Sequence, residues 1–209
     1  SEDNFLASDG RCRSYGEDGD GYVPGEGVGA ILIKRLDEAK LAGDHIYAVI
    51  KGGAINHGGK TNGYSVPNPN AMSDLIENVL HKTKIDPRTI GYVEGHGTGT
   101  SLGDPIEIAG LNKVYNEYTK DKQYCAIGSV KSNIGHCEGA AGIASLTKIL
   151  LQFKHKQLVP SLHSEKLNSN IPFEDSPFYV PQELQSWKRI TLEGDKNIEY
   201  PRRAALSSF

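Results

Sequence analysis

Two segments of the chain share one order of features: a short apolar strand, a glycine-rich loop that contains a histidine, and the start of a helix. The first is residues 91–107 (GYVEGHGTGTSLGDPIE), and the second is residues 126–142 (AIGSVKSNIGHCEGAAG). A strand that leads through a loop into a helix is the usual unit of a parallel α/β sheet, because the helix returns the chain to begin a parallel neighbour. The pattern predicts the α/β fold class, with both loops at one edge of the sheet.

The rest of the chain supplies further strands and helices. Apolar residues at helical spacing predict a helix over residues 72–80, with Asn70 as its N-cap. The run DPIE predicts a second helix with Asp104 as its N-cap, and residues 139–153 predict a third. Strands are predicted at residues 28–36, 47–55, 89–94, 124–130 and 203–209. We expect a mostly parallel sheet covered by helices.

Composition excludes several classes of protein. The 209 residues carry a formal net charge of −3, so the charge balance indicates no nucleic-acid partner. No apolar run approaches the ~18 residues of a membrane span, so we expect no membrane association. Three cysteines without CxxC spacing indicate a reducing, cytoplasmic setting. The 24 glycines exceed the typical share of ~7%, and they predict tight turns or close backbone contacts.

The acidic residues concentrate at the start of the chain. Residues 1–29 contain seven acids against Arg11 and Arg13, and we interpret this segment as an acidic surface loop. Its EDGDG run superficially resembles a calcium loop. However, Tyr22 and Val23 occupy a ligand position and the glycine position that an EF-hand requires. The calcium motif is therefore absent.

Three other ligand motifs fail on spacing. The GKT run at residues 59–61 lacks the glycine that a phosphate loop needs at position 54. The GxGxG run at residues 25–29 follows no strand and ends without the last glycine of a dinucleotide fingerprint. A zinc site is also disfavoured, because no pair among its possible ligands has the usual short spacing; these are Cys125, Cys137, His96 and His136. We expect no metal.

The two loops contain the residues best suited to catalysis. His96 lies in the first loop, and Lys131 and His136 lie in the second, although 40 positions separate the histidines. Ligands of open α/β sheets bind at the carboxyl ends of the strands, so we expect these side chains to converge. Thr98 and Thr100 add hydroxyl groups beside His96. Either histidine by itself can equally be a simple turn residue, and that interpretation stays open.

The same loops closely resemble the β-ketoacyl synthase, or ketosynthase, domains of modular polyketide synthases and related fatty-acid synthases. The resemblance depends first on HGTGTSLGDPIE at residues 96–107 and GSVKSNIGH at residues 128–136. DGYVPGEGVGAILIKRL at residues 20–36 and RRAALSSF at residues 202–209 look like the same family in the same order. Essentially the whole chain is covered.

This resemblance implies a thiolase-like layered fold (α/β/α/β/α), of which residues 1–209 would form the C-terminal part of one ketosynthase domain. Residues 1–29 would be an acidic loop region, and residues 30–158 would be the α/β core with the catalytic loops. Residues 159–209 would form an irregular segment and a final strand.

The resemblance also implies a reaction. Ketosynthases load an acyl group onto a cysteine, then decarboxylate a malonyl unit held on acyl carrier protein, and the carbanion attacks the acyl thioester in a Claisen condensation. By motif, His96 and His136 would be the catalytic histidines and Lys131 the active-site lysine. Thr98 and Thr100 would bind the phosphopantetheine arm. Substrates would arrive on the phosphopantetheine of acyl carrier protein, with no cofactor bound directly.

The chain departs from the family at the nucleophile. The family's cysteine lies in an earlier Cys-Ser-Ser-type turn, and none of Cys12, Cys125 and Cys137 has that context. The family's Gly-Phe-Gly-Gly gating loop would follow Phe209. We therefore expect the nucleophile outside residues 1–209. The expected partners are the remaining half of the domain, a second copy in a homodimer, and acyl carrier protein.

Two other function classes stay open. A non-elongating or scaffolding ketosynthase segment would bind or transfer carrier-linked intermediates without condensation. His96 favours the elongating class, because non-elongating relatives commonly lose this histidine. A Cys-His hydrolase built on Cys125 or Cys137 is the remaining class, although Cys125 lies in an apolar strand and is more typical of a core residue.

Overall fold

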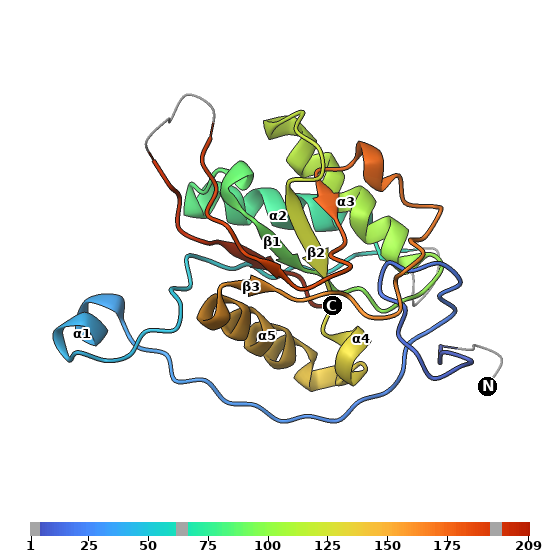
Figure 1. Cartoon of the computed structure of the whole chain (residues 1–209), viewed down its shortest axis with the longest axis horizontal. Coiled ribbons are helices and arrows are strands. Elements are labelled where there is room, and N and C mark those ends of the chain that lie inside the picture. The colour runs from blue at the N-terminus through green and yellow to red at the C-terminus, as the bar shows by residue number, and fades with distance from the viewer. Residues whose placement is uncertain (1–4, 62–66, 193–197) are drawn as a thin grey trace.

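A four-stranded parallel sheet forms the centre of the computed structural model, which describes residues 5–61, 67–192 and 198–209 (Figure 1). The strand order is β4-β2-β1-β6, and every neighbouring pair is parallel. The strands are β1 (Tyr92–Glu94), β2 (Cys125–Gly128), β4 (Phe178–Tyr179) and β6 (Ala204–Leu206). A separate antiparallel pair joins β3 (Gln157–Leu158) to β5 (Gln185–Ser186).

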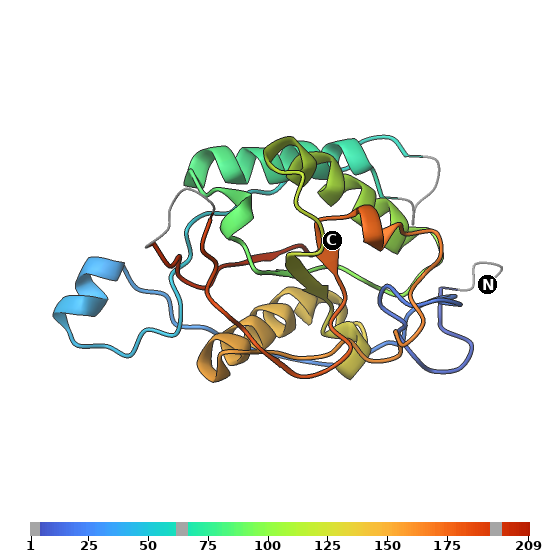
Figure 2. The same cartoon turned by 45° about the horizontal axis from the view of Figure 1, so that its top comes forward.

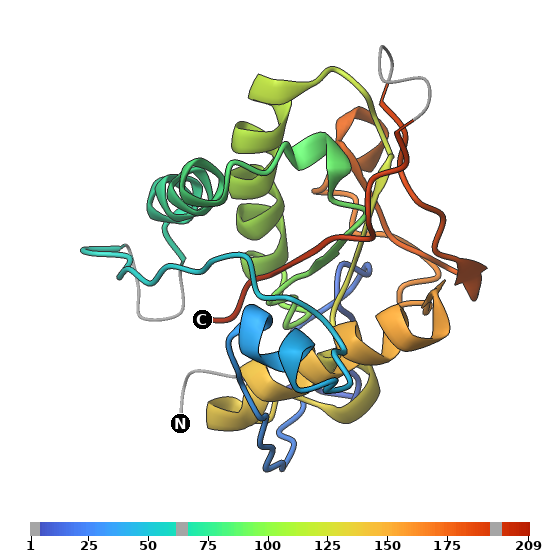
Figure 3. The same cartoon turned by 90° about the vertical axis from the view of Figure 1, so that its left-hand side faces the viewer.

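Helices cover both faces of the sheet (Figures 2 and 3). Helices α2 (Pro69–Thr83) and α3 (Gly103–Tyr118) lie on one face, and α4 (Lys131–Ile134) and α5 (Ala141–His155) lie on the other. Helix α1 (Leu36–Leu41) stands away from this body (Figure 1). Short 3-10 helices occupy Pro87–Thr89, Glu138–Ala140 and Phe173–Asp175. The predicted helix-covered, mostly parallel sheet is confirmed.

Successive strand residues supply two separate cores. Val93 and Ile127 pack with α2 and α3 in the larger cluster, and Tyr92 and Ala126 pack with Ile149 of α5 in the smaller one. This alternation follows from the two-residue period of a strand. Because helices cover both faces, the two central strands β1 and β2 are buried along their whole length, as parallel strands usually are. In the described part of the chain, no helix is both long and apolar enough to cross a membrane.

The helix caps differ from the sequence prediction. Asn68, rather than Asn70, caps α2, and its Oδ1 accepts from the main-chain N–H groups of Asn70 and Ala71 at 3.0 and 3.3 Å. Leu102, rather than Asp104, stands at the N-cap position of α3. The Asp104 carboxylate instead turns toward main-chain N–H groups of other segments, which need an acceptor because they are buried.

Two predicted strands are wrong. Residues 28–36 run without a ladder into α1, and residues 47–55 contain no strand. Val28 is fully exposed, and Leu32 and Ile55 are each 97% exposed. A strand needs a neighbour to pair its main-chain groups, and the described residues offer neither segment such a neighbour. Apolar composition alone therefore did not produce a strand.

Candidate active site

Strands β1 and β2 direct their two loops to the same edge of the sheet. Their parallel ladder ends with Glu94 beside Gly128. Just beyond that pair, the rings of His96 and His136 meet edge to face, with centroids 5.4 Å apart. Lys131 Nζ donates to the main-chain oxygen of His96 at 2.6 Å. The expected convergence of these three residues is confirmed.

Main-chain contacts determine which nitrogen of each histidine can donate. The N–H of Glu138 donates to His136 Nδ1 at 3.1 Å, and the N–H of Phe209 donates to His96 Nδ1 at 3.2 Å. A neutral imidazole has one N–H, so a ring whose Nδ1 accepts carries its proton on Nε2. Both histidines are thus oriented as Nε2–H donors.

Burial keeps both rings neutral at neutral pH. Burial, followed by the charge of Lys131 and the neighbouring His136, lowers the pKa of His96 from 6.5 to about 3. Burial and Lys131 also lower the pKa of His136, and Glu138 partly opposes this shift. Burial lowers the pKa of Lys131 itself, although nearby carboxylates such as Glu107 act in the opposite direction. The site therefore offers two uncharged donors beside a lysine.

The buried carboxylate of Glu107 shapes the first loop. Its Oε1 accepts from the N–H of His96 at 2.7 Å, and its Oε2 accepts from the N–H of Gly97 and the hydroxyl of Tyr15, each at 3.0 Å. Gly97 has φ +41°, a conformation that glycine adopts at low cost. Burial raises the pKa of Glu107, and these donors oppose the rise. Glu107 thereby fixes the main chain at His96.

The DPIE run predicts Glu107 only as a residue of the helix start, and this role in the loop does not follow from that pattern. One feature of the sequence could have indicated it: Glu107 lies one turn inside a helix that follows a glycine-rich loop, where its carboxylate can accept from the loop's main-chain N–H groups. Such a loop has many main-chain N–H groups and few side chains to accept from them.

Segment 5–29 supports both loops. Tyr15 is fully buried, and its N–H donates to Asp104 Oδ2 at 2.7 Å. The N–H of His136 donates to the oxygen of Val23 at 2.7 Å, and the N–H of Gly25 donates to the oxygen of His136 at 2.9 Å. Acidic side chains of the segment are largely exposed, as expected of an acidic loop, but its main chain is part of the site.

The two threonines lie beside His96 in the first loop. Their hydroxyl oxygens are 3.3 Å apart, and Thr100 Oγ1 accepts from the N–H of Gly103 at 3.1 Å. Thr98 is 8% exposed, and Thr100 is partly exposed. Their binding of a phosphopantetheine arm stays a prediction.

All three cysteines are free and buried. Burial raises the pKa of Cys125 and of Cys12, which disfavours the thiolate that a nucleophile needs. Cys137 Sγ lies 3.7 Å from the main-chain oxygen of Glu26. The interpretation of Cys125 as a core residue is confirmed by its complete burial. Within the described ranges, no group of three histidine, cysteine or acidic residues could hold a metal.

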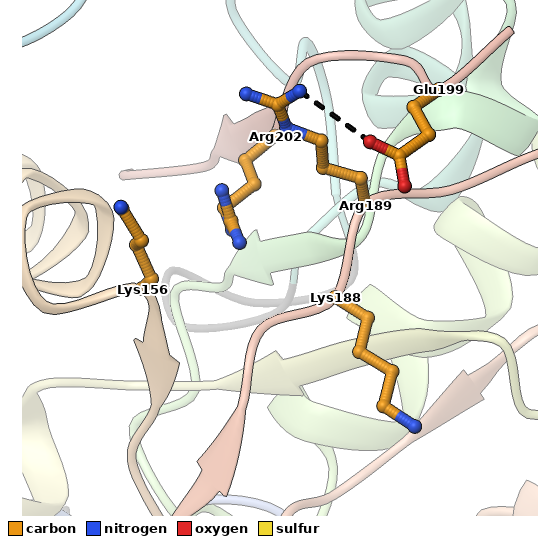
Figure 4. A pocket seen from close by; sticks show the side chains of 5 residues that line it. All are labelled: Lys156, Lys188, Arg189, Glu199 and Arg202. Carbon is orange, nitrogen blue, oxygen red and sulfur yellow. Dashed lines mark ion pairs between the residues drawn. The ribbon is translucent and has the colours of Figure 1, made fainter.

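Two clefts of the described part of the chain are lined by neither His96 nor His136. One, of about 460 Å³, is lined by four basic residues and one acid, with an Arg189–Glu199 ion pair at 3.5 Å (Figure 4). These residues are Lys156, Lys188, Arg189, Glu199 and Arg202, and none belongs to the two loops. The other is a groove of about 450 Å³ along α5, with Val28, Ile143 and Leu151 among its lining residues. Neither cleft contains both histidines.

Comparisons with known proteins agree with the resemblance carried by the loops. Residues 47–165 match the family model described as Beta-ketoacyl synthase, C-terminal domain, and residues 1–39 match Beta-ketoacyl synthase, N-terminal domain. The polyketide synthase PksL of Bacillus subtilis (strain 168) is 65% identical over 210 residues, which cover 100% of this chain and 5% of PksL. The polyketide synthase ThaG of Burkholderia thailandensis is 53% identical over 210 residues, covering 100% of this chain and 4% of ThaG.

Solved structures show the same similarity. The oxazolomycin ketosynthase domain OzmH KS7 of Streptomyces albus JA3453 has a TM-score of 0.93 at 50% identity, covering 98% of this chain and 36% of that one. The ketosynthase from module 6 of the bacillaene synthase of Bacillus subtilis 168 has a TM-score of 0.91 at 48% identity, covering 98% and 35%. The chain thus spans about a twentieth of these curated relatives and about a third of these solved chains. The prediction of a thiolase-like ketosynthase fold is confirmed.

Proposed function

The chain belongs to the β-ketoacyl synthase family, and we propose that it supplies the decarboxylation machinery of a ketosynthase domain in a polyketide synthase. The reaction is the decarboxylative Claisen condensation of malonyl-acyl carrier protein with an enzyme-bound acyl thioester. The observation that carries the proposal is that His96 and His136 meet at one sheet edge and each accepts a main-chain N–H at Nδ1. Nε2 is therefore the donor of each ring in its neutral form.

This geometry suits an enolate. Decarboxylation breaks the bond between C2 of the malonyl unit and its carboxylate carbon, and CO₂ leaves. The electron pair remains on C2 and is shared with the thioester oxygen, where negative charge develops. His96 and His136 donate to that oxygen, and preorganised donors of this kind are each worth ~3–4 kcal/mol on the barrier. C2 then attacks the acyl thioester carbon, and the thiolate leaves.

Lys131 acts on this site through the main chain. Its Nζ holds the His96 oxygen at 2.6 Å, and Ser129 Oγ donates to the same oxygen at 3.1 Å. Burial and, after it, the charge of Lys131 keep His96 from taking a proton, because both lower the pKa of that ring. Thr98 and Thr100, which lie beside His96, bind the phosphopantetheine arm of the carrier protein. No cofactor beyond this arm is needed.

The nucleophilic cysteine lies outside residues 1–209 in this proposal. The burial of Cys12, Cys125 and Cys137 supports it, because buried cysteines are typically inert. Burial also raises the pKa of Cys12 and of Cys125. The partner that supplies the cysteine is the remaining half of the ketosynthase domain. Residues 1–209 are then the C-terminal part of that domain, with an acidic loop region at 1–29, the catalytic loops within 30–158, and an irregular segment with the last strand at 159–209.

Exposed apolar surface supports that partner. Val28, Leu32 and Leu151 are 100%, 97% and 50% exposed, and Val28 and Leu151 line the groove along α5. Apolar surface of this kind is typical of a face that another part of a protein covers. The solved ketosynthase chains are about three times as long as this chain, so they contain enough polypeptide to cover it. The complete domain works as a homodimer in the cytoplasm, where three unpaired thiols stay reduced.

The test uses the complete ketosynthase domain that contains this chain. We expect His96→Ala and His136→Ala each to slow decarboxylation of malonyl-carrier protein by ~10²–10³-fold. His81→Ala, at the exposed end of α2, is the matched control and leaves the rate unchanged. Decarboxylation at the unaltered rate in both loop variants would show the proposal to be wrong.

The same assay separates the second candidate, a non-elongating segment. His96 supports the elongating reaction, since it is present and oriented by Phe209. A domain that accepts and passes on carrier-linked acyl groups but forms no condensed product would favour the non-elongating function. Full condensing activity in residues 1–209 by themselves would disprove an external nucleophile.

A further inference from the structure

A buried ion pair joins the end of β1, two residues before His96, to α5. Glu94, the last residue of β1, is fully buried, and Lys148 of α5 is 8% exposed. Lys148 Nζ lies 3.0 Å from Glu94 Oε2 and 5.6 Å from the ring centre of Tyr92. The hydroxyl of Tyr92 donates to the same carboxylate oxygen. The lysine and the tyrosine therefore hold the Oε2 side of the carboxylate in one place.

The other carboxylate oxygen reaches the second loop. Glu94 Oε1 accepts from the N–H of Val130 at 2.6 Å. Val130 lies beyond the last ladder pair, Glu94 beside Gly128, and directly precedes Lys131 at the start of α4. The Glu94 side chain thus accepts the hydrogen bond of the Val130 N–H, which inside the sheet would go to a main-chain oxygen of the neighbouring strand.

Glu94 consequently ties the two catalytic loops together. Along the chain it lies two residues before His96, and through space it holds the residue next to Lys131. Lys131 in turn holds the main-chain oxygen of His96. These contacts therefore link the two loops to each other, and the Glu94–Lys148 ion pair connects them to α5.

Gly128 makes room for this anchor. A Cβ at Gly128 would lie 3.2 Å from the Tyr92 hydroxyl and 3.5 Å from Lys148 Nζ. The first distance is tighter than ordinary van der Waals contact. The strand residue opposite Glu94 is therefore small where the lysine and the tyrosine converge.

We propose that Glu94, held by Lys148 and Tyr92, is a positioning residue that fixes Val130 and thereby sets where Lys131 and His136 lie relative to His96. The inference rests on the proposed function, because it assigns Glu94 to the same decarboxylation site. Glu94 touches no substrate and acts through the main chain. Removing two charges from water costs free energy that their mutual attraction often does not recover. A buried pair is therefore better explained by a role in specifying one arrangement than by a gain in stability.

Two double variants of the complete ketosynthase domain separate positioning from simple stability. Glu94→Gln with Lys148→Met removes both charges but keeps an acceptor for the Val130 N–H. Glu94→Leu with Lys148→Met removes both charges and that acceptor. We expect the Gln pair to keep near-normal kcat for malonyl-carrier protein decarboxylation. We expect the Leu pair to lose about 100-fold in kcat with little change in KM, the size of effect that follows from misplacing catalytic groups by ~1 Å.

Hydrogen exchange at the Val130 amide is the readout independent of activity. It should be slow in the unaltered domain and in the Gln pair, and at least tenfold faster in the Leu pair. If the Leu pair does not fold, Glu94→Asp is the alternative variant. It keeps the charge opposite Lys148 but shortens the side chain, which withdraws the carboxylate from the Val130 N–H. We expect the same loss of kcat and of protection at the Val130 amide.

Equal kcat and equal Val130 protection in the Gln and Leu pairs would overturn the proposal. Equal loss in both pairs would also overturn it, because the charge rather than the acceptor would then matter. His96→Ala and His136→Ala in the same assay distinguish a failure of the proposed function: if they decarboxylate normally, the reaction assignment fails, while the amide exchange still reports whether Glu94 anchors Val130.

Discussion

Lys131 Nζ donates to the main-chain oxygen of His96 at 2.6 Å, although 35 positions separate the two residues. This contact is one of several that link the two loops at the edge of the sheet. It also places a cationic group beside a half-buried imidazole, and both desolvation and that charge depress the pKa of His96 to about 3. The lysine is therefore coupled to the histidine both by position and by charge.

Replacing Lys131 should raise the pKa of His96. In Lys131→Met the charge that disfavours protonation is gone, while Ser129 Oγ still donates to the His96 oxygen. An NMR titration of the His96 ring measures the shift, and Lys154→Met on the exposed side of α5 is the matched control. An unchanged His96 pKa in a folded Lys131→Met domain would refute the charge coupling.

The depressed pKa of His96 predicts how stability depends on pH. The unfolded ring binds a proton below ~6.5, whereas the folded ring does so only near 3. Stability from this residue is therefore present above pH ~6.5 and is lost as the pH falls toward 3, with a slope of at most ~1.4 kcal/mol per pH unit.

Denaturant unfolding of the complete domain at pH 7, 6 and 5 measures this slope. The His96→Gln variant should show a shallower fall than the unaltered domain, and His81→Gln, at the exposed end of α2, controls for the loss of a histidine elsewhere. Parallel curves for His96→Gln and the unaltered domain would contradict the prediction.

Tyr15→Phe should weaken the support of the first loop. The Tyr15 hydroxyl donates to Glu107 Oε2 at 3.0 Å inside the core, and its loss leaves a buried carboxylate with one donor fewer. We expect a loss of ~1–3 kcal/mol in the free energy of unfolding. Tyr118→Phe, on a side chain that is 40% exposed, should change it by less than ~0.5 kcal/mol. Similar values for the two variants would argue against this role of Tyr15.

Gly95 should not tolerate a side chain. A Cβ at Gly95 would lie 1.9 Å from the Tyr15 hydroxyl and 3.1 Å from Glu107 Oε1, and neither buried group has room to move. Gly95→Ala should therefore cost at least ~2 kcal/mol and slow decarboxylation, because the loop must shift. Nothing lies within 4 Å of a Cβ at Gly139, so Gly139→Ala is the matched control. Thermal unfolding of both variants checks the difference, and an equal effect would show that Gly95 has no special contact.

Much of the site was predictable because its signals are local. His96, Lys131 and His136 follow two strands, and parallel strands place their following loops at one edge. Helix α2 was predictable from its apolar spacing, and β1 and β2 from short apolar runs between turns. The support of the site was not predictable, because it depends on contacts between distant residues, such as Tyr15 with Glu107.

The apolar runs at residues 28–36 and 47–55 show the limit of pattern alone. Their composition is that of buried strands, yet both lack a ladder in the structure and expose side chains such as Val28 and Ile55. Composition records which residues favour burial, whereas a strand also requires a neighbour for its main-chain hydrogen bonds.

By itself the sequence determined the fold class, the family and the two loops, since periodicity and short motifs depend on neighbours in the chain. Only the tertiary structure decided which main-chain N–H each buried carboxylate accepts from. Glu107 accepts from His96, and Glu94 accepts from Val130. Asp104 accepts from Tyr15 instead of capping α3 as predicted. The physical reason is that a buried N–H takes whichever acceptor the packed chain brings within about 3 Å, and packing is a property of the whole fold.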